Sequence, residues 1–516
     1  MRRIKSILDM GFGAGLIAGA IAALAMLALR FALGVPSVQE LIVEKSLSNL
    51  SPRAFEFLLE RFYSLGKPLA VLGTTVALAA AGGPAGVALQ RALGRLPASL
   101  RRWWLLSGML FGIALWLLVS LALTPLLGYG LFGANVTGGA ASYSLATLVA
   151  TALYGLAFAR ITRAPPAAAS PTHQISTGMT RRAFLSHAAF WIVVVGAVGF
   201  GVRSLASGVL TVARSRVSPR DAGVLPLEIT PNDRFYKVSK NFVDPEVDGV
   251  SWRLRIGGMV DNPAALTLAQ LRSMPAVEHY QTLECISNPV GGDLTSNALW
   301  RGVSLRDLLD QAGVKPGALR ITFRSADGYT ETLPLDDAMR PEVLIAYEMN
   351  GVPLNTDHGF PARVLIPGRY GMKGPKWLEE IGTTDDPDLR GYWEQRGWDD
   401  RAEVKTTSQT LVPATGTTMP VEAAIIGGIA FSGDKGISQV EFSDDGGKTW
   451  HRGSVRPALS PYTWVLWTAE WRPPEPGRYR LSVRAYDAKG TEQDPQRRDP
   501  APSGATGYHI ITAVAG

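Results

Sequence analysis

The sequence predicts three parts in order: an all-α membrane bundle, a mixed α+β domain and an all-β sandwich. Long apolar segments are confined to about the first 205 residues. Beyond Arg216, short β-branched runs alternate with helical patches and Gly/Pro turns, and from about Val421 strand patterns follow one another almost without helix. We expect four membrane helices in 1–163, a linker with a fifth helix in 164–213, the α+β domain in 214–415 and the sandwich in 416–516.

Five segments in the first part are apolar over about 20 residues, the length needed to cross a bilayer. They are residues 10–35, 68–89, 103–127, 141–159 and 184–202. Arg30 lies near the end of the first segment, where its long side chain could extend to the membrane surface. We therefore expect a multi-pass membrane anchor.

The charges of the loops predict the orientation of this anchor. The N-terminus "MRRIK" and the loops 91–102 and 159–182 are rich in Lys and Arg and lack acids, whereas the loop 128–139 is uncharged. The positive-inside rule then places the N-terminus in the cytoplasm and, after five crossings, the remaining chain outside. The expected location is the bacterial inner membrane, with the second half on the periplasmic side. The net charge of +7 comes from the membrane half, so nucleic acid is not an expected partner.

The stretch "MTRRAFLSHAAF", residues 179–190, precedes the last apolar segment. Two arginines before a hydrophobic run are typical of a twin-arginine export signal, which serves proteins that fold around a cofactor in the cytoplasm. The positive-inside bias alone would also place arginines here. Both interpretations fit the sequence.

Cys285 is the only cysteine in the chain, and it lies in "TLECISNPVGG", residues 282–292. A lone cysteine excludes a disulfide framework, a CxxC pair and an iron–sulfur site. It follows a strand-like stretch and precedes a Pro/Gly turn, where a thiol can be presented to a ligand or packed as a small hydrophobe. His187 is the only histidine in an apolar segment, so we expect no haem with paired axial histidines.

Several stretches, in order, resemble the sulfite-oxidase family of molybdopterin enzymes over about residues 225–516. They are "TPNDRFY", "TLECISNPVGG", "NALWRGVSLRDLL", "HGFPARVLIPGRYGMKGPKWL" and "WEQRGW". The C-terminal strands resemble the immunoglobulin-like dimerisation domain of that family. The resemblance is to the bacterial, haem-free branch, and it implies a molybdenum–molybdopterin cofactor, a homodimer formed through the last domain and a sulfite-oxidase-type α+β domain.

The resemblance also implies roles for particular residues. Cys285 matches the single protein ligand of the metal, and a thiolate suits a soft, high-valent metal. The positions that match pterin and phosphate contacts are Phe235, Tyr236, Ser325 or Asp327, His358, Arg363, Gly374, Pro375 and Lys376. Trp398 stands where the family has its active-site tyrosine, and Tyr392 or Arg396 could take over that catalytic role.

The sequence departs from sulfite oxidases because "ISNPVGG" places no cation after Cys285. Without positive charge, a small dianion is a poor substrate, and an uncharged or larger, even protein-bound, sulfoxide or N-oxide is favoured. The expected chemistry is two-electron oxygen-atom transfer, with a quinone or cytochrome as redox partner. The alternative is a non-catalytic envelope module that uses the scaffold for binding. A transport function is poorly supported, because Arg30 and His187 are essentially the only ionisable residues in the apolar segments.

Overall fold

The computed structural model describes residues 2–33, 35–48, 66–94, 104–136, 139–162, 225–241 and 244–516. The chain divides into two compact units, an N-terminal helical unit and a larger unit that begins at Val217. The fifth apolar segment and the twin-arginine-like stretch lie outside the described residues, so both stay predictions.

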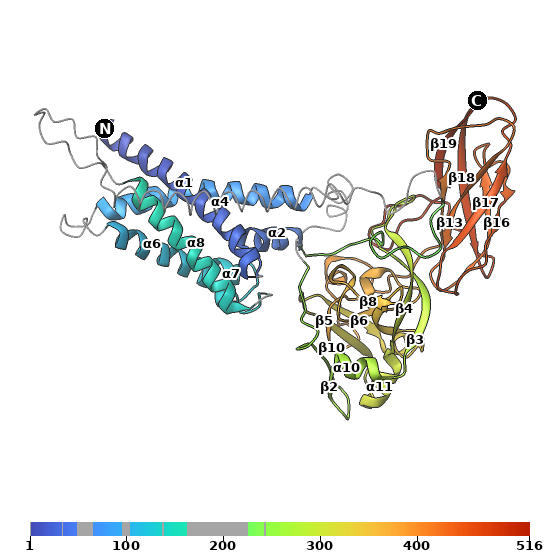
Figure 1. The fold of residues 1–516 in the computed structure, drawn as a ribbon, viewed down its shortest axis with the longest axis horizontal. Helices are drawn as coiled ribbons and strands as arrows, with labels where there is room; N and C mark the ends of the chain where they lie inside the picture. The colour runs from blue at the N-terminus through green and yellow to red at the C-terminus, as the bar shows by residue number, and fades with distance from the viewer. Residues whose placement is uncertain are drawn as a thin grey trace, which may run out of the picture. The chain divides into compact units, whose positions relative to one another are not determined.

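The N-terminal unit is built of helices (Figure 1). They are α1 (Arg2–Leu33), α2 (Val38–Ser48), α4 (Gly66–Gly94), α6 (Trp104–Leu118), the π-helical turn η1 (Val119–Leu123), α7 (Thr124–Leu126), the 3-10 turn η2 (Leu131–Gly133) and α8 (Ala140–Ile161). Among the residues that the structure describes, four helical segments are long and apolar enough to cross a membrane: Gly11–Arg30, Leu69–Leu93, Trp104–Leu126 and Ala140–Ile161. These match four of the five segments expected from the sequence.

Glycines allow these helices to pack closely. A Cβ atom on Gly82 of α4 would lie 2.4 Å from the carbonyl oxygen of Gly15 on α1. A Cβ on Gly155 of α8 would lie 1.9 Å from the carbonyl oxygen of Gly108 on α6. Small residues at such crossings let helix backbones approach, as in membrane helix pairs. The Tyr154 hydroxyl also donates to the Gly82 carbonyl at 2.6 Å, which joins α8 to α4.

Arg30, at the end of the first apolar segment, forms a buried ion pair. Its Nε atom lies 2.6 Å from Oε1 of Glu40 on α2, and both side chains are buried. The hydroxyl and the N–H of Ser37 also donate to Glu40. An acidic partner on the next helix thus compensates the charge of Arg30 inside the unit.

The second unit contains an α+β domain with two sheets. The first sheet has the order β2 (Ala264–Thr267), β1 (Arg253–Gly258), β10 (Leu378–Thr384), β5 (Arg320–Ser325), β6 (Thr330–Pro334). The second has the order β3 (Val277–Glu284), β4 (Thr295–Ser304), β7 (Leu344–Met349), β8 (Val352–Pro353), with β9 (Arg363–Leu365) on β7. The short helices are α10 (Leu268–Ser273), α11 (Leu305–Ala312), α12 (Leu335–Ala338) and the 3-10 turns η3 (Thr356–His358), η4 (Gly371–Lys373) and η5 (Glu394–Arg396).

Both sheets contribute to one large core. Leu254 and Ile321 come from the first sheet, Ile345 and Val364 from the second, and Leu309 of α11 packs with them. Helix α11 buries the apolar face formed by its leucines and ends at Gly313, whose φ of 67° suits a left-handed helix cap. This core fixes the strand ends and turns on which the candidate site is built.

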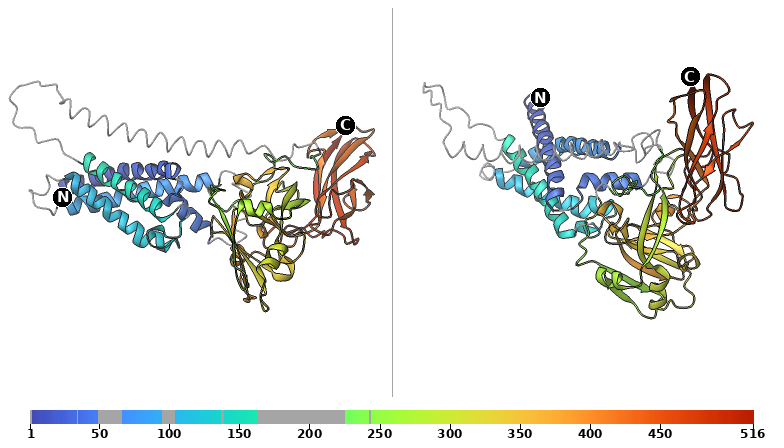
Figure 2. Two further views of the ribbon diagram at one scale, coloured as in Figure 1. Left: turned by 60° about the horizontal axis from the view of Figure 1, so that its bottom comes forward. Right: turned by 45° about the vertical axis from the view of Figure 1, so that its right-hand side comes forward.

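The C-terminal region is β-rich, and its strands are drawn in orange and red (Figure 2). One sheet has the order β11 (Thr407–Val412), β13 (Ala424–Phe431), β17 (Val465–Trp471), β16 (Ser454–Val455). The other has the order β12 (Thr418–Met419), β19 (His509–Ala515), β18 (Gly477–Asp487), β14 (Ile437–Ser443), β15 (His451–Arg452). Both sheets bury side chains in a common core around Trp467 and Trp471.

The C-terminal region also contacts the α+β domain directly. The N–H of Trp464 donates to the Thr282 hydroxyl at 2.9 Å, and the Gln409 amide donates to the Gly292 carbonyl at 2.8 Å. Thr282 and Gly292 flank Cys285 on either side. The β-rich region thus supports the strand and the loop that hold the cysteine, a role that the sequence did not suggest.

Candidate active site

Cys285 lies immediately after β3, at the start of a tight turn. Its N–H donates to the Leu294 carbonyl at 2.9 Å, and its own carbonyl accepts the N–H of Asn288 at 3.0 Å. The Sγ atom lies 3.0 Å from the Ser287 hydroxyl. Burial raises the pKa of the Cys285 thiol above its ordinary value. A free thiolate is therefore disfavoured here, whereas coordination to a metal cation would supply the missing charge and deprotonate the thiol.

Phe235 and Tyr236 lie close to this cysteine and to the neighbouring loop. The Phe235 ring packs edge-on against Trp300 and His358, with ring centroids 5.6 and 5.4 Å apart. Burial, and then the proximity of Cys285, raise the pKa of Tyr236 well above its ordinary value. A Cβ atom on Gly371 would lie 2.7 Å from the Tyr236 hydroxyl oxygen. Gly371 thus leaves room for this neutral hydroxyl donor.

Arg363 is a buried cation at the start of β9. Two of its guanidinium nitrogens donate to the carbonyls of His358 and Gly374 at 3.3 and 3.4 Å, and its plane lies over Trp300. Its Nε has no hydrogen-bond partner. No carboxylate forms an ion pair with Arg363 among the residues described. Burial lowers its pKa to about 10, so its positive charge is kept at a free-energy cost.

His358 and Lys376 lie around the same guanidinium. The Nε2–H of His358 donates to the Asn232 carbonyl at 2.8 Å. Burial lowers the pKa of His358 to about 4, so its ring is neutral at pH 7, with Nδ1 as an acceptor. Lys376 donates to the Asp357 carbonyl at 2.9 Å and lies 3.8 Å from Asp244. Burial, and the charge of Arg363 in addition, lower the pKa of Lys376 to about 8.

This arrangement fits an anionic, polar ligand such as a pterin with a phosphate tail. Buried cations are normally paired, and an unpaired one is costly. Arg363 has an unsatisfied donor and no acid partner in the described structure. A bound phosphate would supply both a hydrogen-bond acceptor and a negative charge. The backbone at Gly374 passes so close to Val364 that a Cβ would lie 2.6 Å from its carbonyl oxygen. The loop "KGPK" can therefore follow this path only with a glycine at that place.

The turn after β5 separates the two alternatives that the sequence left open. The Ser325 hydroxyl is buried without a hydrogen-bond partner. Asp327 instead accepts from the Asn241 amide at 2.8 Å and from its own turn at Tyr329. Asp327 thus shapes the turn, whereas Ser325 has a hydroxyl to offer a ligand. The N–H of Ala326 donates to the Trp377 carbonyl, which ties this turn to the cofactor loop.

The segment that follows β10 brings Trp398 toward Cys285. Trp398 is buried in one cluster with Ile286, Tyr370 and Met372, and Ile286 is the residue after the cysteine. Tyr392 makes other contacts. The guanidinium carbon of Arg396 lies 3.6 Å from the centroid of the Tyr392 ring, and the ring centroids of Tyr392 and Tyr329 are 5.7 Å apart. Of the three candidate catalytic residues, Trp398 is the one that shares a cluster with the cysteine loop.

Sequence reasoning missed two groups around the cysteine. Ser287 touches the sulfur, and its place two residues after the cysteine was the only available signal. Trp300 supports both Phe235 and Arg363, although it is distant from them in the chain. Its position in the quoted stretch "NALWRGVSLRDLL" could have suggested a role, but a strand tryptophan is usually core.

The comparison with known proteins decides the family. Residues 241–393 match the family described as "Oxidoreductase molybdopterin binding domain". The chain is 32% identical to sulfite oxidase of Arabidopsis thaliana over 286 residues, which is 46% of this chain and 72% of that protein. It is 32% identical to sulfite oxidase of Gallus gallus, over 46% of this chain and 62% of the relative, and 35% identical to the uncharacterized oxidoreductase YuiH of Bacillus subtilis, over 30% and 76%.

The chain belongs to the sulfite-oxidase family of molybdopterin-dependent oxidoreductases. Its cofactor is accordingly the molybdenum–molybdopterin group, as expected from the motifs. The match to the molybdopterin-binding family covers Cys285, Arg363 and the loop up to Lys376. The chain spans less than two thirds of the length of the chicken sulfite oxidase that it matches. The helical N-terminal unit lies outside the family match.

Proposed function

We propose that this protein is a membrane-anchored, extracytoplasmic oxidoreductase that transfers an oxygen atom in a two-electron reaction, with Cys285 as the protein ligand of molybdenum. The observation that carries the proposal is that one buried thiol, Cys285, and one buried cation, Arg363, both lie close enough to Tyr236 to affect its pKa, and that the cation lacks an acid partner in the described structure. A bound metal would take the Cys285 thiol as a ligand, and a bound phosphate would pair with the Arg363 guanidinium.

The protein's part in the reaction is to bind, orient and shield. The molybdenum cofactor, when bound, supplies the two-electron chemistry. Arg363 and Lys376 would hold its phosphate, and neutral His358, the Ser325 hydroxyl and the Tyr236 hydroxyl would offer hydrogen bonds to its polar edges. Trp398, packed with Ile286, would cover the cysteine side of the pocket and exclude water. Backbone groups of Gly374 and Pro375 would line the cofactor loop.

We propose an uncharged or larger substrate, such as a sulfoxide or an N-oxide, in place of the sulfite dianion. Among the described residues, Glu284 is the one charged side chain that affects the pKa of Cys285. A negative neighbour opposes a dianion, and an oxyanion needs donors or cations at the reacting centre. Tyr392 and Arg396 would not act at the metal, because they lie outside the cluster that contains Ile286 and Trp398.

The helical unit would anchor the enzyme. Leu110 and Leu118 of α6 and Val76 of α4 expose 58%, 61% and 61% of their surface, which suits a lipid environment. Together with the loop charges, this supports an inner-membrane protein with its cofactor domain on the periplasmic side and a quinone or cytochrome as redox partner. We also propose that the C-terminal β region is immunoglobulin-like and mediates a homodimer.

The first test is metal analysis of the full chain, purified in detergent from cells that make the cofactor. We expect about one molybdenum per chain, and sulfoxides or N-oxides to react faster than sulfite with a redox dye. A protein without molybdenum would contradict the proposal and leave the non-catalytic module as the better account. Faster turnover of sulfite would contradict the substrate assignment alone.

A further inference from the structure

Lys373 is a fully buried cation next to the cofactor loop, outside the set of cofactor contacts. It is the last residue of η4, directly before Gly374. Its ammonium donates to Oε1 of Glu331 on β6 and to Oε1 of Glu394 in η5, both at 2.7 Å. All three side chains are at most 1% exposed. One lysine therefore serves two buried carboxyl groups.

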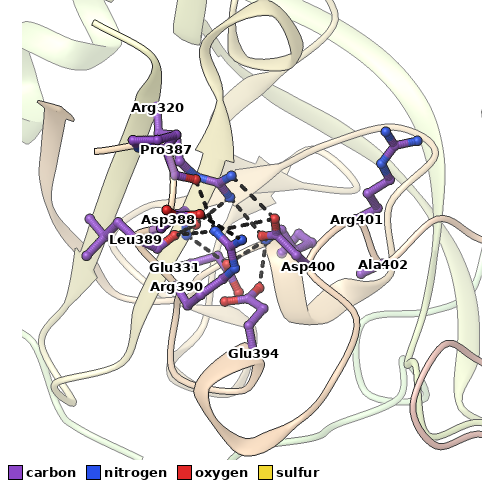
Figure 3. A network of polar contacts seen from close by, with 12 residues as sticks. Arg320, Glu331, Pro387, Asp388, Leu389, Arg390, Glu394, Asp400, Arg401 and Ala402 are labelled. Atoms are coloured by element: carbon purple, nitrogen blue, oxygen red, sulfur yellow. Dashed lines mark hydrogen bonds and ion pairs between the residues drawn. The ribbon is translucent and has the colours of Figure 1, made fainter. Parts of the chain in front are cut away.

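The neighbouring charges do not balance the second carboxyl group. Arg320 of β5 forms a fork with Asp400, at 2.7 and 3.3 Å, and so its charge is used there. Arg390 lies 3.8 Å from the same Asp400 and is partly exposed. Figure 3 shows Arg320, Glu331, Glu394 and Asp400 directed toward one another. If both Glu331 and Glu394 were ionised, Lys373, which also lies 3.8 Å from Asp400, would have to compensate two buried negative charges alone, which is unfavourable.

If one of the two carboxyl groups is protonated, hydrogen-bond geometry indicates which oxygen carries the proton. The Tyr329 hydroxyl lies 2.8 Å from the Met372 carbonyl oxygen and 3.1 Å from Oε2 of Glu331. A hydroxyl has one proton, and a carbonyl and a carboxylate both only accept. With the hydroxyl proton donated to the Met372 carbonyl, the shorter of the two contacts, the contact to Oε2 of Glu331 is a full hydrogen bond when that oxygen carries a proton and donates it to Tyr329. The other oxygen of Glu331 is already an acceptor for Lys373 and for the N–H of Thr332.

The electrostatic environment agrees with this geometry. Burial raises the pKa of Glu331 to about 8; Lys373 opposes the rise and the charge of Glu394 adds to it. The Oε2 of Glu394 is buried without a hydrogen-bond partner. Glu394 accepts a hydrogen bond from Lys373, and its side-chain hydrogen bond with Glu331 also raises the pKa of Glu331.

The cluster joins two parts of the candidate site. On one side, η4 leads directly into Gly374, Pro375 and Lys376. On the other, η5 begins at Glu394 and leads to Trp398 four residues later. We propose that Glu331, protonated on Oε2, and Lys373 are positioning residues that hold the cofactor loop and the Trp398 segment together. The effect on catalysis rests on the proposed function, whereas the proton on Glu331 does not.

The proton is tested on the full chain in detergent by infrared spectroscopy. The wild-type protein should show the C=O stretching band of a protonated carboxyl group that shifts in D2O and disappears as the pH rises through about 8. Glu331→Gln keeps the shape and one donor but cannot ionise, so the band should be missing at every pH. A wild-type band that is absent at pH 6, or one that persists unchanged in E331Q, overturns the assignment.

The positioning role is tested by cofactor content and by the pH profile of kcat/KM. We expect the wild-type kcat/KM to fall above pH 8, whereas E331Q should retain its molybdenum and show no such fall. Lys373→Met should lose most of its molybdenum, because the ionised Glu394 then has no cation beside it and Glu331 loses a hydrogen-bond donor. The double variant Lys373→Met/Glu394→Gln removes the ionised carboxyl group and should regain cofactor. Lys315→Met, at an exposed lysine of the same domain, is the control and should match the wild type.

Two results would overturn the positioning role. One is a K373M protein with full molybdenum and unchanged kinetics. The other is an E331Q protein whose kcat/KM still falls above pH 8 as in the wild type. A protein that shows the titrating band and binds molybdenum, yet turns over no sulfoxide, N-oxide or sulfite, contradicts the proposed function and leaves the proton assignment intact.

Discussion

Arg363→Met gives opposite effects on the apoprotein and the holoprotein, and this contrast separates a ligand-binding arginine from a structural one. In the apoprotein, Arg363 is a buried cation, and burial lowers its pKa from its ordinary value to about 10. This fall corresponds to a cost of about 3 kcal/mol for keeping the charge. Methionine removes that cost and also two long hydrogen bonds, of about 1 kcal/mol each. The apoprotein should therefore be unchanged or more stable by about 1 kcal/mol.

In the holoprotein the same change removes the charged donors for the phosphate. A charge-assisted hydrogen bond contributes about 1.5–3 kcal/mol, so losing one or two corresponds to about 100-fold weaker cofactor binding. The assay compares full chains from cells with and without cofactor synthesis, by thermal unfolding and by molybdenum and pterin content. Arg255→Met, at an exposed arginine paired with Glu380, is the matched control. An R363M apoprotein that loses more than about 2 kcal/mol, or an R363M protein with full cofactor, would refute the reasoning.

Three further predictions concern stability and packing. Burial lowers the pKa of both His358 and His509 to about 4. Below pH 6.5 these histidines bind protons in the unfolded chain but not in the folded protein, so the free energy of unfolding decreases as the pH falls from 6.5 toward 4. The thermal midpoint should fall in that window, and it should fall less in His→Gln variants. Gly82→Leu should disrupt the packing of α4 on α1 and cause aggregation in detergent, seen by size-exclusion chromatography; a monodisperse variant would contradict the close approach. Thr282→Val removes the acceptor of the Trp464 N–H and should lower the free energy of unfolding by about 1–3 kcal/mol, measured by thermal unfolding. An unchanged thermal midpoint would show that the β region does not stabilise the strand before Cys285.

The order of the structural parts was predictable because each has its own periodicity. Continuous apolar runs predicted four of the described helices, and alternating strands predicted the C-terminal β region. The fate of Arg30 was not predictable, because its partner Glu40 lies beyond a turn and only the packed helices bring the two together. The sequence showed that the charge was there, but not that it was compensated inside the unit.

The residues of the candidate site could be predicted from the sequence where a motif keeps them close together in the chain. The loop from Arg363 to Lys376 and the stretch around Cys285 are of this kind. The choice between Ser325 and Asp327 needed the structure, because it depends on which side chain finds a partner across the chain. Lys373 looked like any loop lysine, since Glu331 and Glu394, its two partners, lie 42 and 21 residues away.

The central claim is that Cys285 is the protein ligand of molybdenum. X-ray absorption at the molybdenum edge, on full-length wild-type protein and on a Cys285→Ser variant of equal cofactor content, tests it most directly. The account predicts one sulfur ligand fewer at the metal in the variant, with the fold retained. An identical sulfur shell in both proteins would contradict it.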